Sequence, residues 1–315
     1  MAYDNDEIQK GEKVLTKATA WYTIPTYVFL ISWGLISFIP MIWMFLTAFL
    51  PKEALQKMPP DLNLRLLTLD NFRDIFAFHS DKLQLGFTEI FGIEAVKLRF
   101  STGVIVAWFL NSFFLATINT CFNLFFDSLA GYSFAKRDFP GRNFLFWTLI
   151  CTMMIPGQVV LVPLFLMMIN LGLYDTHLAL ILPAIAGVFG IFLMKQYIQS
   201  MPSGLEEAAR IDGCSEFGIF WKIILPLCKP VLAVLGIFVF VGNWNNFLWP
   251  MICLKTENKY TLQVGLSILQ QLQEHDVHFG LQMAGAVIAA GPILLVFLFL
   301  QKYFIRGLTI GGVKG

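Results

Sequence analysis

The sequence predicts an all-α membrane protein with six transmembrane helices and both termini in the cytoplasm. Of its 315 residues, 57% are hydrophobic and 14% are charged, so the chain has more apolar surface than a soluble fold of this size can bury. Six stretches lack Asp, Glu, Lys and Arg over a length that crosses a hydrocarbon core as a helix, about 20 residues. No segment shows the alternating polarity of barrel strands of about ten residues.

The six charge-free stretches set the order of the predicted helices. The first contains 34 residues, which exceeds the apolar core of a signal peptide, and no small-residue cleavage site follows it, so we expect a retained helix. A polar segment, 52–99, separates it from the second stretch, and the other connections are shorter. The predicted spans are 18–51, 100–126, 143–174, 176–194, 230–254 and 277–301.

The distribution of lysine and arginine predicts which side of the membrane each connection faces. With both termini inside, the inner segments contain 13 Lys and Arg and the outer segments contain nine. Seven of those nine lie in the long 52–99 segment, and the two short outer connections share only Lys255 and Lys259. Because positive charge in short loops favours the cytoplasmic side, both termini are predicted to be cytoplasmic.

Signatures of a cofactor or a metal are missing from the sequence. The five cysteines have neither disulfide nor zinc spacing. His275 and His278 are three residues apart, but only Glu274 and Asp276 are near them, so we expect solvated loop histidines. The chain lacks a G-x-x-x-x-G-K-S/T phosphate loop and is not expected to bind ATP itself. We therefore predict no catalytic residue, bound metal or cofactor in this chain.

One polar segment, 199–229, has the pattern of two short helices that meet at a glycine. Ser203 and Glu206 have the spacing of a capping box, so a helix is expected to begin there with Ser203 as its cap. Glu206 and Arg210 are four residues apart, which supports an exposed helix, and Gly213 is placed to end it in a left-handed conformation. A second amphipathic run follows. Its predicted apolar face is Phe217, Phe220, Trp221 and Ile224.

Within this segment, seven residues over twenty positions match a specific motif. Glu207-Ala208-Ala209 is followed by Gly213 after three residues, and then by Ile223 and Leu225-Pro226. This spacing resembles the EAA loop in the permease subunits of ATP-binding-cassette (ABC) importers. A short helical pair with an acidic residue and two small residues is also suited to a groove on a partner protein. A capped connector without a partner is the plainer interpretation of the composition.

The C-terminus makes the resemblance more specific. Residues 301–315 (QKYFIRGLTIGGVKG) look like the end of the carbohydrate-type permeases, in particular the second permease subunit of the maltose and glycerol-3-phosphate importers. Segments 130–135 (AGYSFA) and 244–250 (WNNFLWP) agree with it. The resemblance covers 100–315 well and the first hundred residues loosely, and 77–102 is longer than the family usually has.

The resemblance implies a fold, a function and an assembly. The fold would be that of a type I ABC importer permease, with one domain over 1–315 and a core at about 100–305. The chain would form half of the translocation path for a sugar or sugar-like solute in the cytoplasmic membrane of a bacterium or archaeon. Its partners would be a second, unlike permease, two ATPase subunits that hold ATP and Mg, an extracytoplasmic solute-binding protein, and lipid. No nucleic acid is expected.

In this family the EAA loop is the coupling helix, which carries motion between the ATPase subunits and the path. The resemblance implies that role for Glu207, Ala208, Ala209, Arg210, Asp212, Gly213, Ile223, Leu225 and Pro226. The family's C-terminal tails reach the ATPase subunits, which implies the same contact for Gly311, Gly312 and Lys314. Because this tail contains four glycines, we also expect a flexible strand after Arg306.

Two groups of polar residues in the predicted spans are candidates for the sugar path. The first forms a stripe within about 40° on one side of a helix, where it can line the path or bond to a neighbouring helix. The second combines amides with an aromatic face, which suits a polyol. Packing is the plainer role of both. The groups are Ser112, Asn119 and Asn123, and Asn243, Trp244, Asn245 and Asn246.

The predicted outer loop between the fifth and sixth spans is rich in glutamine. In the maltose-type importers, the matching loop reaches into the cleft of the binding protein and helps to displace the sugar. Amide side chains could replace the hydrogen bonds that a departing sugar loses. The resemblance therefore implies contact with the binding protein for Gln270, Gln271 and Gln273, whereas a cap over the path is the plainer alternative.

Two other classes of function would require residues that the predicted spans lack. An ion-coupled secondary transporter of a small polar solute usually has Asp, Glu, Lys or Arg within its spans, and the predicted spans contain none. A membrane-embedded enzyme would need a Ser/His/Asp set, a metal cluster or a buried carboxylate pair in its spans, and none is evident. The energy for transport is therefore expected to come from another subunit.

Overall fold

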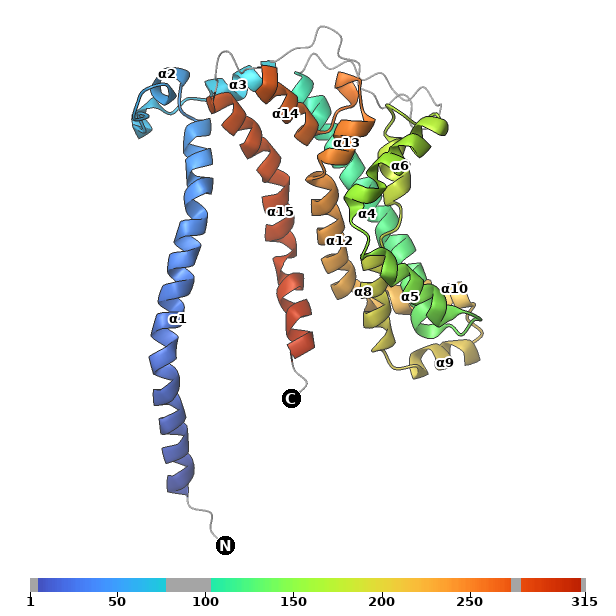
Figure 1. Cartoon of the computed structure of the whole chain (residues 1–315). Coiled ribbons are helices and arrows are strands. Elements are labelled where there is room, and N and C mark those ends of the chain that lie inside the picture. Colours follow the sequence, from blue (N-terminus) through green and yellow to red (C-terminus); the bar gives the residue numbers. More distant parts are fainter. Residues whose placement is uncertain (1–4, 78–102, 273–278, 313–315) are drawn as a thin grey trace. The chain divides into compact units, whose positions relative to one another are not determined.

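The computed structural model describes residues 5–77, 103–272 and 279–312 and, among these, contains helices and no strands (Figure 1). The contacts between residues cluster into two compact units. The first unit is Met1–Asn71 with Phe279–Val287, and the second is Phe72–His278 with Ile288–Gly315. The expectation of one domain over 1–315 stays a prediction.

Within the first unit, α1 is the long apolar helix, and its end is fastened by a side chain from the following segment. Asn71 donates from Nδ2 to the carbonyl oxygens of Ala48 (2.9 Å) and Leu50 (2.8 Å). These carbonyls lie where the helix ends and lacks backbone donors, so a side-chain amide satisfies them. The elements are α1 (Asn5–Ala48), α2 (Lys52–Leu55), η1 (Leu64–Leu66) and the beginning of α3 (Asp70–Ala77).

The predicted spans correspond to four long apolar helices and two bent pairs. The pair Arg142–Thr152 and Gly157–Asn170 (α5 and α6) is bent by 99°, and Pro156 caps the second helix of this pair. Six spans result if each bent pair is counted as one, which agrees with the sequence. The four segments that qualify without such a bend are Thr23–Ala48, Val104–Lys136, Leu178–Gln199 and Phe279–Phe299, and the other bent pair is Glu216–Leu227 with Lys229–Trp244, at 81°.

The second unit is built around α4 (Val104–Lys136), which packs against α8 and α12 (Figure 1). Gly131 allows the approach of α4 to α8, because a Cβ at this position would lie 2.6 Å from the Cβ of Met194. Close backbone approach of this kind is typical of helix pairs in membranes. The partner helices are α8 (Val188–Gln199) and α12 (Lys229–Trp244).

Further helices in the second unit surround the N-terminal half of α4. A buried apolar cluster joins Leu115 of α4 to Met168 of α6, Leu180 of α7 and Cys253 of α13. Here α14 crosses close to α4, since a Cβ on Gly265 would lie 2.1 Å from the ring of Trp108. The remaining elements are α7 (Leu178–Ile181), η3 (Leu182–Ala184), α13 (Leu248–Cys253), η5 (Glu257–Lys259) and α14 (Leu262–Leu272).

The last helix, α15 (Phe279–Gly312), corrects the expected secondary structure of the tail. The four glycines after residue 306 predicted a flexible strand, but the helix continues through Gly307 to Gly312. Glycine costs only about 1 kcal/mol relative to alanine within a helix, so a preceding apolar helix can extend through it. Lys314 lies outside the described residues, and contact of the tail with an ATPase stays a prediction.

Candidate functional site

The segment that contains the EAA motif folds into a short helix, a glycine turn and a second helical stretch. We call residues 199–229 the coupling loop. Its first helix begins after Ser203, as expected, but the predicted capping box is wrong. Ser203 already has helical backbone angles and makes no side-chain capping bond, and its carbonyl accepts from the N–H groups of Glu206 and Glu207. The elements are α9 (Gly204–Ile211), α10 (Glu216–Ile219), a π-helical turn (Phe220–Ile224) and α11 (Leu225–Leu227).

Gly213 ends α9 in the left-handed conformation that the sequence predicted. Its φ is +80°, its N–H donates to the carbonyl of Arg210 at 3.0 Å, and the N–H of Cys214 donates to that of Ala209 at 3.0 Å. These two bonds form a Schellman motif, which satisfies carbonyls at the end of the helix. After the turn, Ser215 caps α10 and accepts from the N–H of Gly218 at 3.2 Å.

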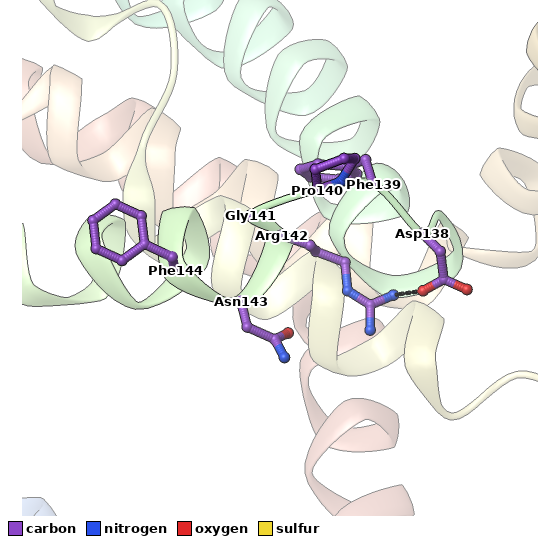
Figure 2. A pocket seen from close by; sticks show the side chains of 7 residues that line it. All are labelled: Asp138, Phe139, Pro140, Gly141, Arg142, Asn143 and Phe144. Carbon is purple, nitrogen blue, oxygen red and sulfur yellow. Dashed lines mark hydrogen bonds and ion pairs between the residues drawn. The ribbon is translucent and has the colours of Figure 1, made fainter.

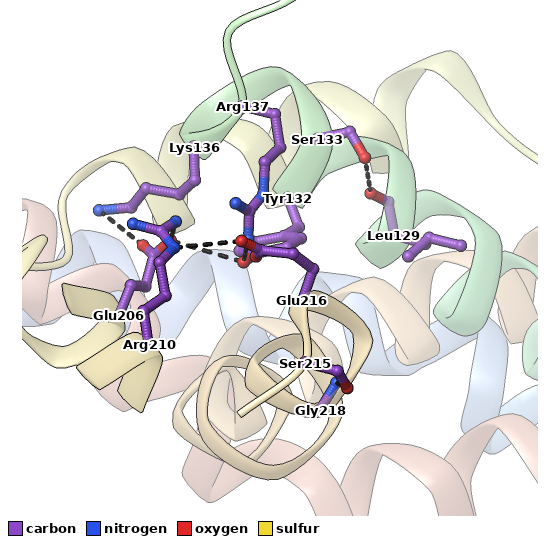
Figure 3. Close-up of polar contacts among 10 residues, drawn as sticks. All are labelled: Leu129, Tyr132, Ser133, Lys136, Arg137, Glu206, Arg210, Ser215, Glu216 and Gly218. Carbon is purple, nitrogen blue, oxygen red and sulfur yellow. Dashed lines mark hydrogen bonds and ion pairs between the residues drawn. The ribbon is translucent and has the colours of Figure 1, made fainter. Parts of the chain in front are cut away.

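Glu206 points toward α4 and is almost fully buried, with 3% of its side chain exposed (Figure 3). Lys136 Nζ lies 3.4 Å from its Oε1 and Arg210 Nη2 lies 3.6 Å from its Oε2. The hydroxyl of Tyr132 donates to Oε2 at 3.5 Å. The Glu206–Arg210 pair and the exposure of Arg210 were therefore predicted correctly, whereas the burial of Glu206 was not. Removing one partner of a buried ion pair costs about 3–5 kcal/mol.

A second acidic residue of the coupling loop, Glu216, extends this arrangement into a network. Its Oε1 accepts from Arg210 Nε at 3.1 Å, and its Oε2 pairs with Arg137 Nη2. Arg137 also donates to the hydroxyl of Tyr132. Figure 3 shows that residues of α9 and α10 converge on the C-terminal end of α4. We call Tyr132, Lys136, Arg137, Glu206, Arg210 and Glu216 the ion network.

Apolar contacts hold the other side of the coupling loop. Ala209, Ile219, Phe220 and Ile224 are buried together with side chains from α4, α8 and α12. The predicted apolar face is partly wrong, because Phe217 and Trp221 are exposed and stack on each other, with ring centroids 6.2 Å apart. A π-helical turn contains more residues than an α-turn, so it displaces side chains from the positions that an α-helical period predicts.

The predicted coupling residues occupy both the surface and the interior of this loop. Ala209 is buried, Arg210 belongs to the ion network, and the side chains of two others are half-buried. The exposed members form a surface that a partner can reach. The half-buried residues are Ile223 and Leu225, and the exposed ones are Glu207, Ala208, Asp212, Gly213 and Pro226.

The polar stripe on α4 makes hydrogen bonds within this chain. Ser112 accepts from the N–H of Leu262 at 2.7 Å, and Asn119 donates from Nδ2 to Asn243 Oδ1 at 2.7 Å. Asn123 donates to the carbonyl of Ala184. All three stripe residues are buried. These contacts explain the stripe by packing, and its role in the sugar path stays a prediction.

The second predicted group divides between the interior and the surface. Trp244 is buried and donates from Nε1 to the carbonyl of Ala289 at 2.9 Å. Asn243 also donates to its own helix, at the carbonyl of Val239 (2.9 Å). Asn246 is half-buried and Asn245 is exposed, so the amide of Asn245 is the most accessible of the group.

Asp127 is a buried acidic residue that lies outside the spans predicted from the sequence. Its side chain is fully buried, its Oδ1 accepts from the N–H of Gly187 at 2.9 Å, and its Oδ2 has no hydrogen-bond partner. It was missed because the charge-free stretch ends at residue 126, whereas α4 continues to Lys136. The four-residue spacing of Asn119, Asn123 and Asp127 was the available signal. The claim that no span contains an acidic residue is therefore wrong, and it cannot serve as an argument against an ion-coupled transporter.

Side chains near the N-terminal end of α4 hold the backbone of the segment 254–261, which we call the 254–261 loop. Trp108 donates from Nε1 to the carbonyl of Glu257 at 2.9 Å. Asn111 donates from Nδ2 to the carbonyls of Asn258 (2.8 Å) and Tyr260 (3.0 Å). These bonds lie on successive positions of one helical face and reach main-chain atoms.

Two residues between α6 and α7 support the same loop. The carboxylate of Asp175 accepts from the N–H groups of Lys255 (2.8 Å) and Thr256 (2.9 Å). Although burial by itself would raise the pKa of Asp175, these bonds and that from the Thr256 hydroxyl hold it below its usual value. His177 is buried, and its Nε2 lies 3.1 Å from the carbonyl oxygen of Lys259. The carboxylate of Asp175 therefore stays ionised at neutral pH, which is the form that accepts the bonds from the loop.

Other predicted positions lie apart from these contacts. Gln270 and Gln271 are exposed on α14, whereas Gln273 and the two histidines at 275 and 278 lie outside the described residues. Among the described side chains, no group of three metal ligands occurs. A hollow of about 480 Å³ lies beside the loop 138–144, where Arg142 pairs with Asp138 (Figure 2). None of the predicted path residues lines it.

Comparisons with known proteins find components of membrane transport systems. The family model described as "Binding-protein-dependent transport system inner membrane component" matches residues 127–310. The arabinooligosaccharides transport system permease protein AraQ of Halalkalibacterium halodurans is 38% identical over 297 residues, covering 93% of this chain and 98% of that protein. AraQ of Bacillus subtilis is 43% identical over 208 residues, 66% of this chain and 73% of that protein.

A solved structure shows the same fold. A chain of a bacterial ABC transporter involved in the import of the acidic polysaccharide alginate superposes with a TM-score of 0.72. The match covers 96% of this chain and 99% of that chain, at 23% sequence identity.

Proposed function

We propose that this chain forms half of an importer's path for an oligosaccharide. Because its residues 127–310 match the family model, the chain belongs to the binding-protein-dependent transport system inner membrane components. It is a multi-pass permease subunit of an ABC importer and not an enzyme, as the sequence predicted. Such a permease acts with an ATPase and a solute-binding protein. The observation that carries the choice of solute is the near full-length similarity to a permease named for arabinooligosaccharides.

The complete assembly would contain this permease, a second unlike permease, two ATPase subunits and an extracytoplasmic binding protein in a bacterial or archaeal cytoplasmic membrane. The exposed coupling residues support an ATPase contact on one side. Glu207 and Ala208 of α9 and Gly213 in the turn after it are exposed, acidic or small residues, and the ion network holds α9 against α4. ATP and Mg would be held by the ATPase subunits.

In this mechanism, ATP-driven closure of the ATPase subunits draws the coupling loops together and opens the path to the outside. The binding protein then releases its solute into the path, and hydrolysis restores the inward-facing state. Each state must be favoured by contacts that the other state lacks. The coupling loop makes and breaks these contacts as one unit. Asn245 presents an accessible amide for a sugar hydroxyl in this path.

Uptake measurements distinguish this function from the ion-coupled alternative. Deleting this chain should abolish uptake of radiolabelled arabinooligosaccharides, and the intact chain supplied on a plasmid should restore it. Uptake should continue when a protonophore collapses the proton gradient while ATP is maintained, and it should stop when ATP is depleted. Uptake that follows the proton gradient at constant ATP would overturn the proposal in favour of a secondary transporter.

The exposed glutamines of α14 lead to a second prediction. Replacing Gln270 and Gln271 of α14 by alanine, together with Gln273 beyond the described residues, should slow release of the solute from the docked binding protein, because amides that compete for the sugar's hydrogen bonds are lost. The stimulation of ATPase activity by loaded binding protein should fall, whereas a pull-down should still recover the complex. Replacing Gln263 of the same helix, which is half-buried, serves as the control. Unchanged stimulation and uptake in the triple variant would reduce α14 to a structural lid.

A further inference from the structure

We propose that α4 is the relay that links the coupling loop to the 254–261 loop, and through it links the ATPase contact to the binding-protein contact. One end of α4 is joined to α9 and α10 by the ion network, and the other end holds the main chain that leads into α14. This inference rests on the proposed function, because it assigns the two loops to the two partners. It assigns a positioning role to Arg137, Glu216, Trp108 and Asn111.

The continuity of α4 is the first support for this role. It is a single helix of 33 residues without a proline, which corresponds to a length of about 50 Å. The two spans that adjoin the coupling loop in sequence are interrupted instead. The span before it is divided between η3 and α8 at Gly187, and α12 is bent by 81° from the helices before it. A displacement of the coupling loop is therefore transmitted along an unbroken helix more directly than through a break.

The joint at the C-terminal end of α4 resists sliding and tilting. Lys136 reaches both Glu206, at 3.4 Å, and the carbonyl of Met201, at 2.7 Å. Arg137 pairs with Glu216 on the second helix of the loop. Because the carboxylate of Glu206 is buried, a movement that separated it from its cations would leave a charge without water or a partner. The coupling loop and the end of α4 therefore move together.

The joint at the N-terminal end has a different chemistry and the same effect. Asn111 and Ser112 lie three and four residues after Trp108, on the same side of α4. The three side chains bond to the backbone of Glu257, Asn258, Tyr260 and Leu262. Leu262 is the first residue of α14, the helix that presents Gln270 and Gln271. A shift of α4 therefore moves α14. Since coupling between two binding sites is reciprocal, docking at α14 biases the ATPase contact to the same extent.

A double-mutant cycle tests the relay in the assembled importer. Arg137→Gln removes the pairing with Glu216, and Asn111→Ala removes two bonds to the 254–261 loop. Each change should lower the ratio of stimulated to basal ATPase activity roughly fivefold, the low end of allosteric coupling. If both act through α4, the double variant should lose no more than the more affected single variant. Thr120→Val, which alters only a bond to Ala116 within α4, is the matched control and should leave the ratio unchanged.

Distant and independent changes would instead combine, giving about a 25-fold loss, and that result would overturn the relay. An unchanged ratio in either single variant would also overturn it. The wild-type importer separates failure of the relay from failure of the proposed function. If loaded binding protein does not stimulate the ATPase activity of the wild type, the proposed function is wrong. If it does, and the losses of the two single variants multiply in the double variant, only the relay is wrong.

A cross-linking experiment tests the relay independently of how much stimulation each single variant loses. The exposed cysteines 121, 151 and 214 are first replaced by serine, and Arg137→Cys is then combined with Glu216→Cys. The pair should lose stimulation, and a bis-maleimide that spans the two thiols should restore it, because the two elements move as one body. A monofunctional maleimide should not restore it. Failure of the cross-link to restore stimulation would contradict joint movement of α4 and the coupling loop.

Discussion

Replacing Gly213 by valine will abolish solute uptake while leaving the chain inserted in the membrane. The φ of +80° at this position is strongly unfavourable for a β-branched residue, and the two Schellman bonds that end α9 depend on it. Crowding is not the cause, because no atom lies within 4 Å of the position that a Cβ would take. The valine therefore costs roughly 1–2 kcal/mol locally and redirects the chain between Arg210 and Glu216, which the ion network needs close together.

Assembly on a native gel and uptake of labelled sugar measure the two parts of this expectation. Glu207→Lys should have the same effect on uptake, because it reverses the charge of an exposed residue without altering the fold. Gly204→Ala is the control, since it lies in the same loop, has no positive φ and has no neighbour within 4 Å. Normal uptake by both the valine and the lysine variants would count against the coupling role.

Gly190→Ala is expected to give the largest loss of stability. A Cβ at this position would lie 1.9 Å from Asp127 Oδ2 and 2.7 Å from its Cγ. The carboxylate is fully buried and is held by the N–H of Gly187, so it cannot move aside without losing that bond. Overpacking and the loss of a buried hydrogen bond together cost about 3 kcal/mol, which should lower the melting temperature by several degrees.

A second change in the same pair separates this clash from a general effect of α8. Asp127→Ala in the Gly190→Ala background removes the obstructing carboxylate and should recover most of the lost melting temperature in detergent. Gly242→Ala, on α12, has no neighbour within 4 Å and should change the melting temperature little. A Gly190→Ala protein with a normal melting temperature, or a double variant no more stable than the single one, would contradict the packing described for α4 and α8.

The parts of the fold and the site that could be predicted are those that depend on residues close together in the chain. Gly213 has a positive φ, and glycine adopts this conformation readily in any context because it lacks a Cβ. The start of α9 was also predictable. The cap was not, since Ser203 and Glu206 fit a capping box by spacing, whereas the carboxylate instead bonds to Tyr132, 74 residues earlier.

The charge-free stretches and the EAA spacing by themselves determined a six-span permease with a coupling loop, because hydrophobic length and motif spacing are written in consecutive residues. Only the tertiary structure decided which polar groups are buried and what they bond to. Asp127 and Gly187 are 60 residues apart, and Asn111 and Tyr260 are 149 apart. A buried polar group takes whatever partner the packed helices bring near it, since an unpaired one is costly in a medium without water, and that partner cannot be read from its neighbours in sequence.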